Sequence, residues 1–383
     1  MITLEADRLA IADMPLYWRI RKPGMAPHPS IPATLPLRLR FDAELGLVRQ
    51  EMDDRLRSVL REIYLAESNI GYLQEGHTLS KGYGEDLLRF LERCIESRGA
   101  KRAIEIGCGG CLMLSALAER GLDVAGIDPS PVAVNAGRTK GVPVIASFFP
   151  PAADVSPAGL IFHSDVLEHV EDPVGFLRDH HRFMEKSGCI AIAVPDSTES
   201  IALGDISMLM HQHLSYFTTG SLRRVVEAAG FTVLGIEKSG YGGSLYCFAS
   251  RGSATRPQPG SIKEEDDRDR GFFERARAAT ANVRRRIEAA RDPGFYMPLR
   301  SAPYLAAFAV IRPGVRVFDD TAHWHRGQID GLPLAIENLS DLAAHPPPNA
   351  LVMSLTFGDV VRGKIRAAAP GVKVATLREL LNG

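Results

Sequence analysis

Between about residues 101 and 251, short apolar runs alternate with amphipathic helical segments. In order, the segments read as strand, helix, strand, helix, strand, strand, helix and strand, and a further helix, strand, loop and strand follow. Strands that alternate with helices in this way are typical of a parallel, doubly wound sheet. The sequence therefore predicts an α/β fold with a Rossmann-like core.

The rest of the chain is predicted to surround this core. A length of 383 residues suggests two or three domains at about 150 residues each. Residues 1–84, which are Pro-rich and then helical, are expected to form a small N-terminal cap, and residues 85–251 the core. Residues 252–297 are expected to combine a Pro-rich, charged linker with a helix. Residues 298–383 are predicted to form a second, smaller α/β domain.

The composition argues against several classes of partner. Forty-five basic and 46 acidic residues leave a net charge of −1, which provides no overall field toward nucleic acid or anionic lipid. The N-terminus carries acidic residues and no uninterrupted apolar run, and no stretch approaches about 18 apolar residues. We expect a cytoplasmic protein that acts on a small molecule, without nucleic acid or a membrane as partner. The oligomeric state stays open.

The five cysteines are dispersed and odd in number, which fits reduced thiols. Cys108 and Cys111 have the CxxC spacing of zinc and redox sites. No second CxxC or Cys/His pair lies nearby in the sequence, so we expect no metal.

The most specific local motif runs from Ala103 to Cys111, where an apolar strand containing an acid turns through a Gly-rich loop into a helix. Such a loop lets the backbone approach a ligand and points helix N–H groups at it. Asp128 follows 23 residues after Glu105, at the end of the next strand, where an acid can bind two vicinal ribose hydroxyls. The pattern predicts a nucleoside site, which we assign to Glu105, Gly107, Gly109, Asp128, Pro129, Phe148 and Asp165.

The loop spacing separates two kinds of nucleoside cofactor. A dinucleotide fingerprint requires GxGxxG, and Leu112 occupies the place of the third glycine, which disfavours NAD or FAD. The E-x-G-x-G pattern instead resembles motif I of class I S-adenosylmethionine-dependent methyltransferases. This resemblance implies S-adenosylmethionine as the cofactor. Cys111, where the family has a further glycine, is expected to crowd the methionine end, and a Gly-rich turn without a ligand remains the alternative.

A second stretch, Leu160 to Pro173, resembles the fourth-strand motif of the same superfamily, whose residues line the cleft between cofactor and substrate. Asp165 also suits the N-cap of the following helix, and the two interpretations are compatible. His169 follows at the open end of the sheet, where ligands bind in open α/β folds.

Two further segments narrow the resemblance. His211 to Phe217 reads H-Q-H-L-S-Y-F, and Gly242 to Leu245 reads G-G-S-L. Both resemble segments of the sugar C-methyltransferases that act on nucleotide-linked keto-deoxysugars, and the likeness covers about residues 40–383. Two departures are visible, because the family's paired N-terminal cysteines are absent and Gln212 replaces the Glu of its H-E-H motif.

The resemblance implies carbon methylation of a nucleotide-activated sugar. A carbon next to a carbonyl must lose a proton before it attacks the methyl group, so a base is required. His213 matches the presumed base and His169 another active-site histidine. Gln212 carries no charge, so His213 is expected to be a weaker base than in the family. The residues expected to bind the substrate are His211, Gln212, Tyr216 and Tyr241.

The resemblance also implies an active-site tyrosine from the N-terminal region. Tyr64, Tyr72 and Tyr83 lie there, and we assign the catalytic role to Tyr72. Two other functions stay open: an O- or N-methyltransferase for another small metabolite, and a non-catalytic binding protein on the same scaffold.

Overall fold

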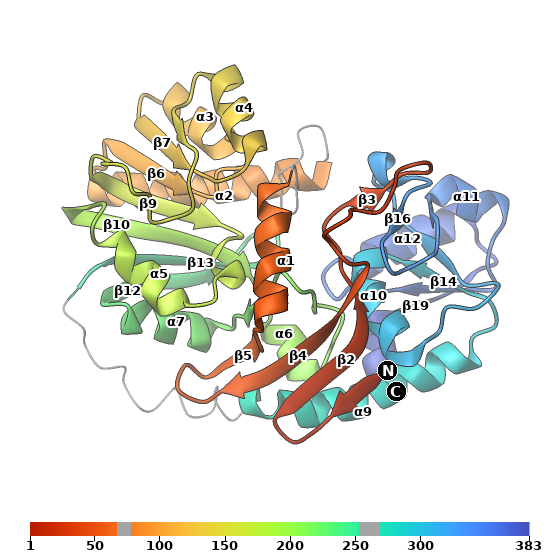
Figure 1. Ribbon diagram of the computed structural model, residues 1–383. Helices are drawn as coiled ribbons and strands as arrows, with labels where there is room; N and C mark the ends of the chain where they lie inside the picture. Colours follow the sequence, from red (N-terminus) through yellow and green to blue (C-terminus); the bar gives the residue numbers. More distant parts are fainter. Residues whose placement is uncertain (67–77, 253–267, 383) are drawn as a thin grey trace.

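The computed structural model describes residues 1–66, 78–252 and 268–382. Its largest sheet has seven strands in the order β12-β13-β10-β9-β6-β7-β8 and forms the body on the left of Figure 1. The strands are β6 (Arg102–Ile106), β7 (Asp123–Ile127), β8 (Val144–Ile145), β9 (Ala158–Ser164), β10 (Met184–Pro195), β12 (Phe231–Lys238) and β13 (Ser244–Arg251).

Strands β6 to β10 run parallel, and β13 is antiparallel to both of its neighbours, β10 and β12. All of β9 except Ser164 is buried, as expected for a strand covered on both faces. The predicted α/β fold with a class I methyltransferase core is confirmed. The helices of this unit are α2 (Thr78–Arg98), α3 (Leu112–Glu119), α4 (Pro131–Lys140), α5 (Pro173–His180), α6 (Thr198–Leu203) and α7 (Thr219–Ala228), with one 3₁₀ turn, η1 (Leu167–His169).

The strand order determines where a ligand can bind. β6 is central, and the chain proceeds from it to β7 on one side and then returns to β9 on the other side. Open α/β sheets bind ligands where the strand order reverses, outside the carboxyl ends of the strands. The loops after β6 and β9 therefore frame the site.

A second, antiparallel sheet follows the order β1-β2-β4-β5-β11. Four of its strands come from the N-terminus, but β11 lies in the region after the core helix α6. This pairing joins the H-Q-H segment to the N-terminal sheet. The strands are β1 (Ile2–Leu4), β2 (Arg8–Pro15), β4 (Thr34–Asp42), β5 (Leu47–Gln50) and β11 (Ser215–Tyr216).

Helix α1 (Asp54–Leu65) follows β5 and stands between the core and the C-terminal unit in Figure 1. Asp53 caps it, because its side chain accepts a hydrogen bond from the backbone N–H of Leu56. One face of α1 is buried, through Leu56, Val59, Leu60 and Ile63.

The C-terminal unit contains a parallel sheet in the order β17-β15-β14-β18-β19. A two-stranded sheet links it to the N-terminus through β3 (Ile20–Arg21) and β16 (Gln328–Ile329). Its other elements are α9 (Phe272–Ala289), β14 (Pro293–Tyr296), α10 (Pro298–Phe308), β15 (Arg316–Phe318), η2 (Ala322–Trp324), β17 (Ile336–Glu337), α11 (Leu339–Ala344), β18 (Asn349–Val352), α12 (Gly358–Ala368), β19 (Lys373–Thr376) and α13 (Leu377–Leu381).

Two predicted boundaries cut through elements of the structure. The strand β14 belongs to the C-terminal sheet, so that unit begins before residue 298, and α2 runs across the boundary at residue 85. The N-terminal and C-terminal units also share one hydrophobic core, in which Leu37 of β4 packs in the same cluster as Phe295 of β14 and Tyr304 of α10. The termini lie close together in Figure 1. None of the described helices is long and apolar enough to cross a membrane.

Candidate functional site

The loop between β6 and α3 requires glycine at specific positions. Gly107 and Gly109 have φ values of +71° and +45°, in the left-handed region that favours glycine. A Cβ atom on Gly107 would lie 2.6 Å from Cγ2 of Val166, in the loop after β9. The two loops that frame the site therefore approach each other more closely than a side chain at position 107 would allow.

Cys111 closes the loop in the same left-handed region, with φ +55°. A non-glycine residue accepts this backbone at a cost of about 1–2 kcal/mol. Its Sγ atom is fully buried, 3.9 Å from Sγ of Cys108 and 3.7 Å from the carbonyl oxygen of Ala133. The expectation that Cys111 crowds the loop is wrong, because its side chain turns into the core. All five cysteines are free thiols.

Asp128 follows β7 and lies next to the glycine loop. Its carboxylate accepts hydrogen bonds from the backbone N–H groups of Gly109, at 2.9 Å, and Ser130, at 2.8 Å. Burial raises the pKa of Asp128, and these two donors counteract part of that effect. Each carboxylate oxygen has a second lone pair that can accept a ribose hydroxyl.

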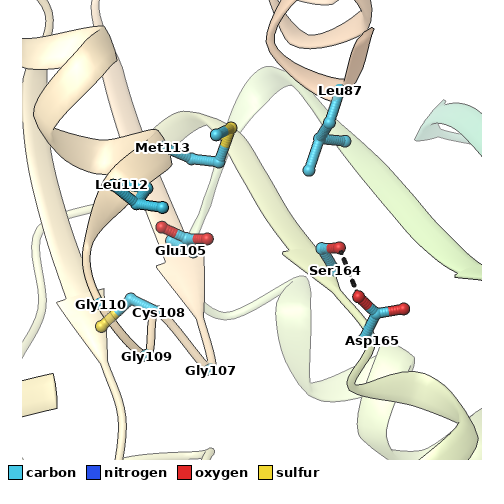
Figure 2. A pocket seen from close by; sticks show the side chains of 10 residues that line it. All are labelled: Leu87, Glu105, Gly107, Cys108, Gly109, Gly110, Leu112, Met113, Ser164 and Asp165. Atoms are coloured by element: carbon cyan, nitrogen blue, oxygen red, sulfur yellow. Dashed lines mark hydrogen bonds between the residues drawn. The ribbon is translucent and has the colours of Figure 1, made fainter. Parts of the chain in front are cut away.

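Glu105, on β6, is the most unusual carboxyl group of the loop region. It is buried, and its Oε2 atom has no hydrogen-bond partner among the described residues. Burial raises the pKa of Glu105 well above its usual value. Figure 2 shows its carboxyl group beside a small cavity of about 50 Å³, between α3 and the loop after β9. A buried acceptor without a partner fits a ligand that donates a hydrogen bond or carries positive charge.

Two larger cavities continue from this loop. One, of about 350 Å³, runs from Asp128 past Gly107 to His169. The other, of about 590 Å³, lies against α1 and shares Tyr64, Phe148 and His169 with it. All seven residues that the sequence assigned to the cofactor line one of the first two cavities: Glu105, Gly107, Gly109, Asp128, Pro129, Phe148 and Asp165.

Asp165 lies where the first two cavities meet, and it is left-handed, with φ +54°. It accepts a hydrogen bond from Oγ of Ser164 at 3.2 Å, drawn in Figure 2, and Ser164 in turn lies 3.2 Å from the hydroxyl of Tyr83. Burial raises the pKa of Asp165 to about 6. Asp165 does not cap the next helix, because Asp172 accepts the capping bond from the backbone of Gly175.

His169 and His213 come together from loops 44 positions apart, with ring centroids 5.0 Å from each other in an edge-to-face arrangement. Nδ1 of His169 donates a hydrogen bond to the backbone oxygen of Gln212 at 2.8 Å. Burial lowers the pKa of His169 to about 4 and that of His213 well below its usual value, and His169 and Arg300 lower the latter further. His169 lines both larger cavities, whereas His213 lies behind it and lines neither.

Glu168 completes this cluster. Its side chain is 1% exposed, and its Oε1 atom lies 3.7 Å from Nε2 of His169. One nitrogen or oxygen atom from each of Glu168, His169 and His213 lies within 4.8 Å of the others, close enough for one metal ion to contact all three. The sequence gives no spacing rule that would have singled out Glu168.

Three of the residues assigned to the substrate are buried elsewhere. His211 is fully buried, with Nε2 3.0 Å from the backbone oxygen of Leu35 in β4, and Nε2 of Gln212 donates to the backbone oxygen of Tyr17. The hydroxyl of Tyr216 bonds to the backbone of Met210. These side chains hold the segment to the N-terminal sheet or close its own loop, and they line none of the three cavities.

The two remaining assignments have different outcomes. Tyr241 lines none of the three cavities and lies against Phe357 of the C-terminal unit, with ring centroids 6.4 Å apart. Tyr72 lies outside the described residues.

Tyr64, on α1, lines both larger cavities. Its ring packs edge to face against the ring of His169, with the two ring centroids 6.1 Å apart. Its place on α1, at the end of the buried face, could have indicated this role.

The comparisons with known proteins agree with this geometry. A family described as a methyltransferase domain matches residues 76–236. The chain is 22% identical over 302 residues to the C-methyltransferase NovU of Streptomyces niveus, covering 71% of each chain. It is 27% identical over 169 residues to a ubiquinone biosynthesis O-methyltransferase of Idiomarina loihiensis, covering 39% of this chain and 69% of the relative.

A solved structure is also similar. The 1,6-didemethyltoxoflavin-N1-methyltransferase of Burkholderia thailandensis has a TM-score of 0.41 and 16% identity, covering 54% of this chain and 96% of the other.

The residues of the first two cavities fit S-adenosylmethionine. Asp128 has lone pairs available for the ribose hydroxyls, the glycine loop leaves room for a close ligand, and Glu105 presents an unpartnered acceptor. These features stand at the carboxyl ends of β6 and β7, within the matched region. The cofactor site, the methyltransferase-domain match and the curated relatives all support one conclusion. The chain is a class I S-adenosylmethionine-dependent methyltransferase.

Proposed function

We propose that this enzyme methylates a carbon atom of a nucleotide-activated sugar or a related natural-product intermediate. The H-x-H and G-G-S-L segments support this acceptor class through their resemblance to sugar C-methyltransferases. The relative NovU, named a C-methyltransferase, matches over 71% of both chains, which includes residues beyond the cofactor core.

The cofactor supplies an electrophilic methyl group, and the chain must supply the rest of the chemistry. Glu105, Asp128 and the glycine loop hold the cofactor. An acceptor carbon next to a carbonyl has to lose a proton, and a buried neutral histidine can accept it. We assign this step to the pair of His169 and His213, in which His169 lines the cavities and His213, the base that the resemblance implies, contacts it. The observation that carries the proposal is that His169, in contact with His213, lines both the cofactor cavity and the cavity next to it.

The cavity of about 590 Å³ has features that suit an anionic acceptor. Arg57 and Arg61 of α1 line it, and the guanidinium of Arg57 is already paired with Glu171. Arg61 lies 5.7 Å from the ring centroid of Phe148 and has no carboxylate partner among the described residues. A diphosphate group would provide the negative charge to pair with the guanidinium of Arg61. Arg300 of α10 adds positive charge on the side of His213.

Product analysis tests this proposal. The enzyme is incubated with nucleotide-linked keto sugars and S-adenosylmethionine that carries ¹³C in its methyl group, and the product is examined by mass spectrometry and carbon NMR. We expect a new carbon–carbon bond in the sugar.

His213→Ala should abolish this turnover while S-adenosylmethionine affinity stays within a few-fold of wild type. Turnover by His213→Ala at the wild-type rate would exclude it as the base. His323→Ala, in the C-terminal unit, provides the matched control.

A second candidate function is O-methylation. The similarity of the chain to ubiquinone biosynthesis O-methyltransferases favours this reaction. One of these enzymes, from Aeromonas salmonicida, is 31% identical to the chain over 156 residues, covering 35% of this chain and 63% of the relative. An oxygen nucleophile also requires a weaker base than a carbon acid. The same NMR experiment distinguishes the two reactions, because a methyl group on oxygen has a different chemical shift from one on carbon.

A further inference from the structure

Glu168 is held against the histidine pair by the backbone. The N–H of Leu214 donates to the backbone oxygen of Glu168 at 2.7 Å, and Nδ1 of His169 donates to the backbone oxygen of Gln212 at 2.8 Å. These two bonds join η1 to the segment that carries His213. The carboxyl group of Glu168 is therefore placed by two loops rather than by a flexible side chain alone.

The ring of His169 and the carboxyl group of Glu168 meet at this point. The backbone oxygen of Gln212 can only accept, so Nδ1 of His169 carries the proton and Nε2 of the neutral ring has a lone pair. That lone pair faces Oε1 of Glu168 at 3.7 Å, and neither carboxyl oxygen has a donor among the described residues. A buried carboxylate opposite a lone pair is unfavourable, whereas a positive charge at the same place makes an ion pair.

We propose that Glu168 is the charge partner of the histidine pair. It is a positioning residue that ionises when S-adenosylmethionine binds and then stabilises the histidine that has taken the acceptor's proton. In the reaction, the proton leaves the acceptor carbon for a histidine nitrogen, and the carbon's electron pair forms the bond to the methyl group. The electron pair of the broken S–C bond stays on sulfur, so one positive charge moves from sulfur to histidine.

This inference corrects the expectation drawn from Gln212. The sequence places no acid beside His213, which predicted a weak base, but the structure brings Glu168 close to both histidines. The role after methyl transfer rests on the proposed proton acceptance by the pair. The ionisation on cofactor binding does not depend on any acceptor.

The groups that surround Glu168 determine its charge. Burial raises the pKa of Glu168 well above its usual value, and the neighbouring charge of Asp165 raises it further, so both effects favour the neutral carboxyl group when no ligand is bound. His169 and His213 are held neutral by burial, and Tyr64 from α1 faces the same carboxyl group. A sulfonium charge in the adjoining cavity favours the carboxylate, and S-adenosylhomocysteine lacks that charge.

Calorimetric titration tests the ionisation. S-adenosylmethionine and S-adenosylhomocysteine are each titrated at pH 8 in two buffers of different ionisation enthalpy, which measures the protons released on binding. We expect S-adenosylmethionine to release up to about one proton more than S-adenosylhomocysteine. In Glu168→Gln this difference should vanish, and the isosteric side chain leaves the fold intact.

Glu237→Gln is the matched control. It is the same carboxyl-to-amide change at a residue of β12 that is paired with Arg93 and lines none of the three cavities, so this variant should keep the difference in proton release. Equal release with both ligands in the wild type, or an unchanged difference in Glu168→Gln, would overturn the proposal. A stoichiometric divalent metal in the purified enzyme that is lost in Glu168→Gln would also overturn it, because these atoms would then be metal ligands.

Turnover provides the second readout. Glu168→Gln should lower turnover at least tenfold and shift the rise of the pH–rate profile, and Glu168→Asp should restore part of the rate. A Glu168→Gln enzyme with wild-type turnover and a wild-type pH profile would show that Glu168 does not stabilise the protonated histidine after methyl transfer. Failure of the acceptor proposal leaves the calorimetric test unaffected, since that test uses only the cofactor and its product.

Discussion

Gln212 shows at the residue scale that a departure from a family motif can follow from packing. Its Nε2 atom donates to the backbone oxygen of Tyr17, and its side chain is fully buried. A glutamate at this position would place a carboxylate against a carbonyl oxygen, so the amide is required as a donor. The carboxyl group that lies near His213 is that of Glu168, from another loop.

Restoring the family residue should therefore damage the protein. We expect Gln212→Glu to lower the free energy of unfolding by about 1–3 kcal/mol without raising turnover, because it leaves a buried charge without a donor. Urea denaturation and initial rates measure both effects, and Gln328→Glu in β16 is the control. A Gln212→Glu enzyme that is as stable as wild type and faster would show that residue 212 acts on His213 directly.

Asp128 allows a test of the cofactor site at the same scale. Asp128→Ala removes the acceptor for the ribose hydroxyls and the bond from Gly109 that shapes the loop. We expect the affinities for S-adenosylmethionine and S-adenosylhomocysteine to fall at least tenfold, about 1.4 kcal/mol. Asp123→Ala, at the opposite end of β7 and paired with Arg102, is the control and should bind normally. Unchanged binding by Asp128→Ala would remove this residue from the site.

At the scale of elements, the short strand β11 positions the histidine pair. It pairs with β5 through Ser215 and Tyr216, and the backbone N–H of Gln50 donates to the carbonyl oxygen of Leu214 at 2.9 Å. His213 lies two residues before this strand. The N-terminal sheet thus acts on the site through a backbone connection, although most of its residues lie far from the cofactor loop.

Tyr216→Phe tests that connection. The tyrosine hydroxyl lies 3.2 Å from the backbone nitrogen of Met210 and 3.3 Å from its oxygen, which closes the loop around His213. Its removal should cost about 1 kcal/mol of stability and lower turnover, while cofactor affinity stays at the wild-type value. Urea denaturation, initial rates and calorimetry measure these three quantities. Weaker cofactor binding would show that the loop acts on the cofactor site instead.

At the scale of the whole molecule, the N-terminal and C-terminal units form one body. Leu37 of β4 and Val317 of β15 belong to the same core cluster, and the hydroxyl of Tyr304 donates to Asp205 of the methyltransferase core at 3.0 Å. The three units are therefore connected through buried contacts rather than through linkers alone.

This arrangement predicts one cooperative unfolding transition. Far-ultraviolet circular dichroism and tyrosine and tryptophan fluorescence should give coincident curves in urea, because the N-terminal sheet cannot lose its packing without exposing the core of the C-terminal unit. Two separated transitions would show that the C-terminal sheet is stable without the N-terminal one.

The sequence predicted the core fold and the cofactor-lining residues, and both have a local origin. A strand, a turn with positive φ and a helix are encoded within about ten residues at Gly107 and Gly109, and Asp128 follows on the next strand. Periodicity and glycine placement report such features directly. Strand β14 was missed because a run of four residues before a proline-rich helix gives little periodic signal.

The arrangement around the histidine pair was decided by tertiary structure. His211, Gln212 and Tyr216 share a motif with His213, but their side chains pack against the N-terminal sheet or their own loop. Glu168, next to His169 in the sequence, reaches His213 from another loop, and Tyr64 reaches His169 from α1. By itself the sequence determined the strand–loop–helix unit that binds the cofactor, because its contacts are close along the chain. Only the folded chain decided which side chains come together around His169 and His213, because those contacts join segments more than 40 residues apart.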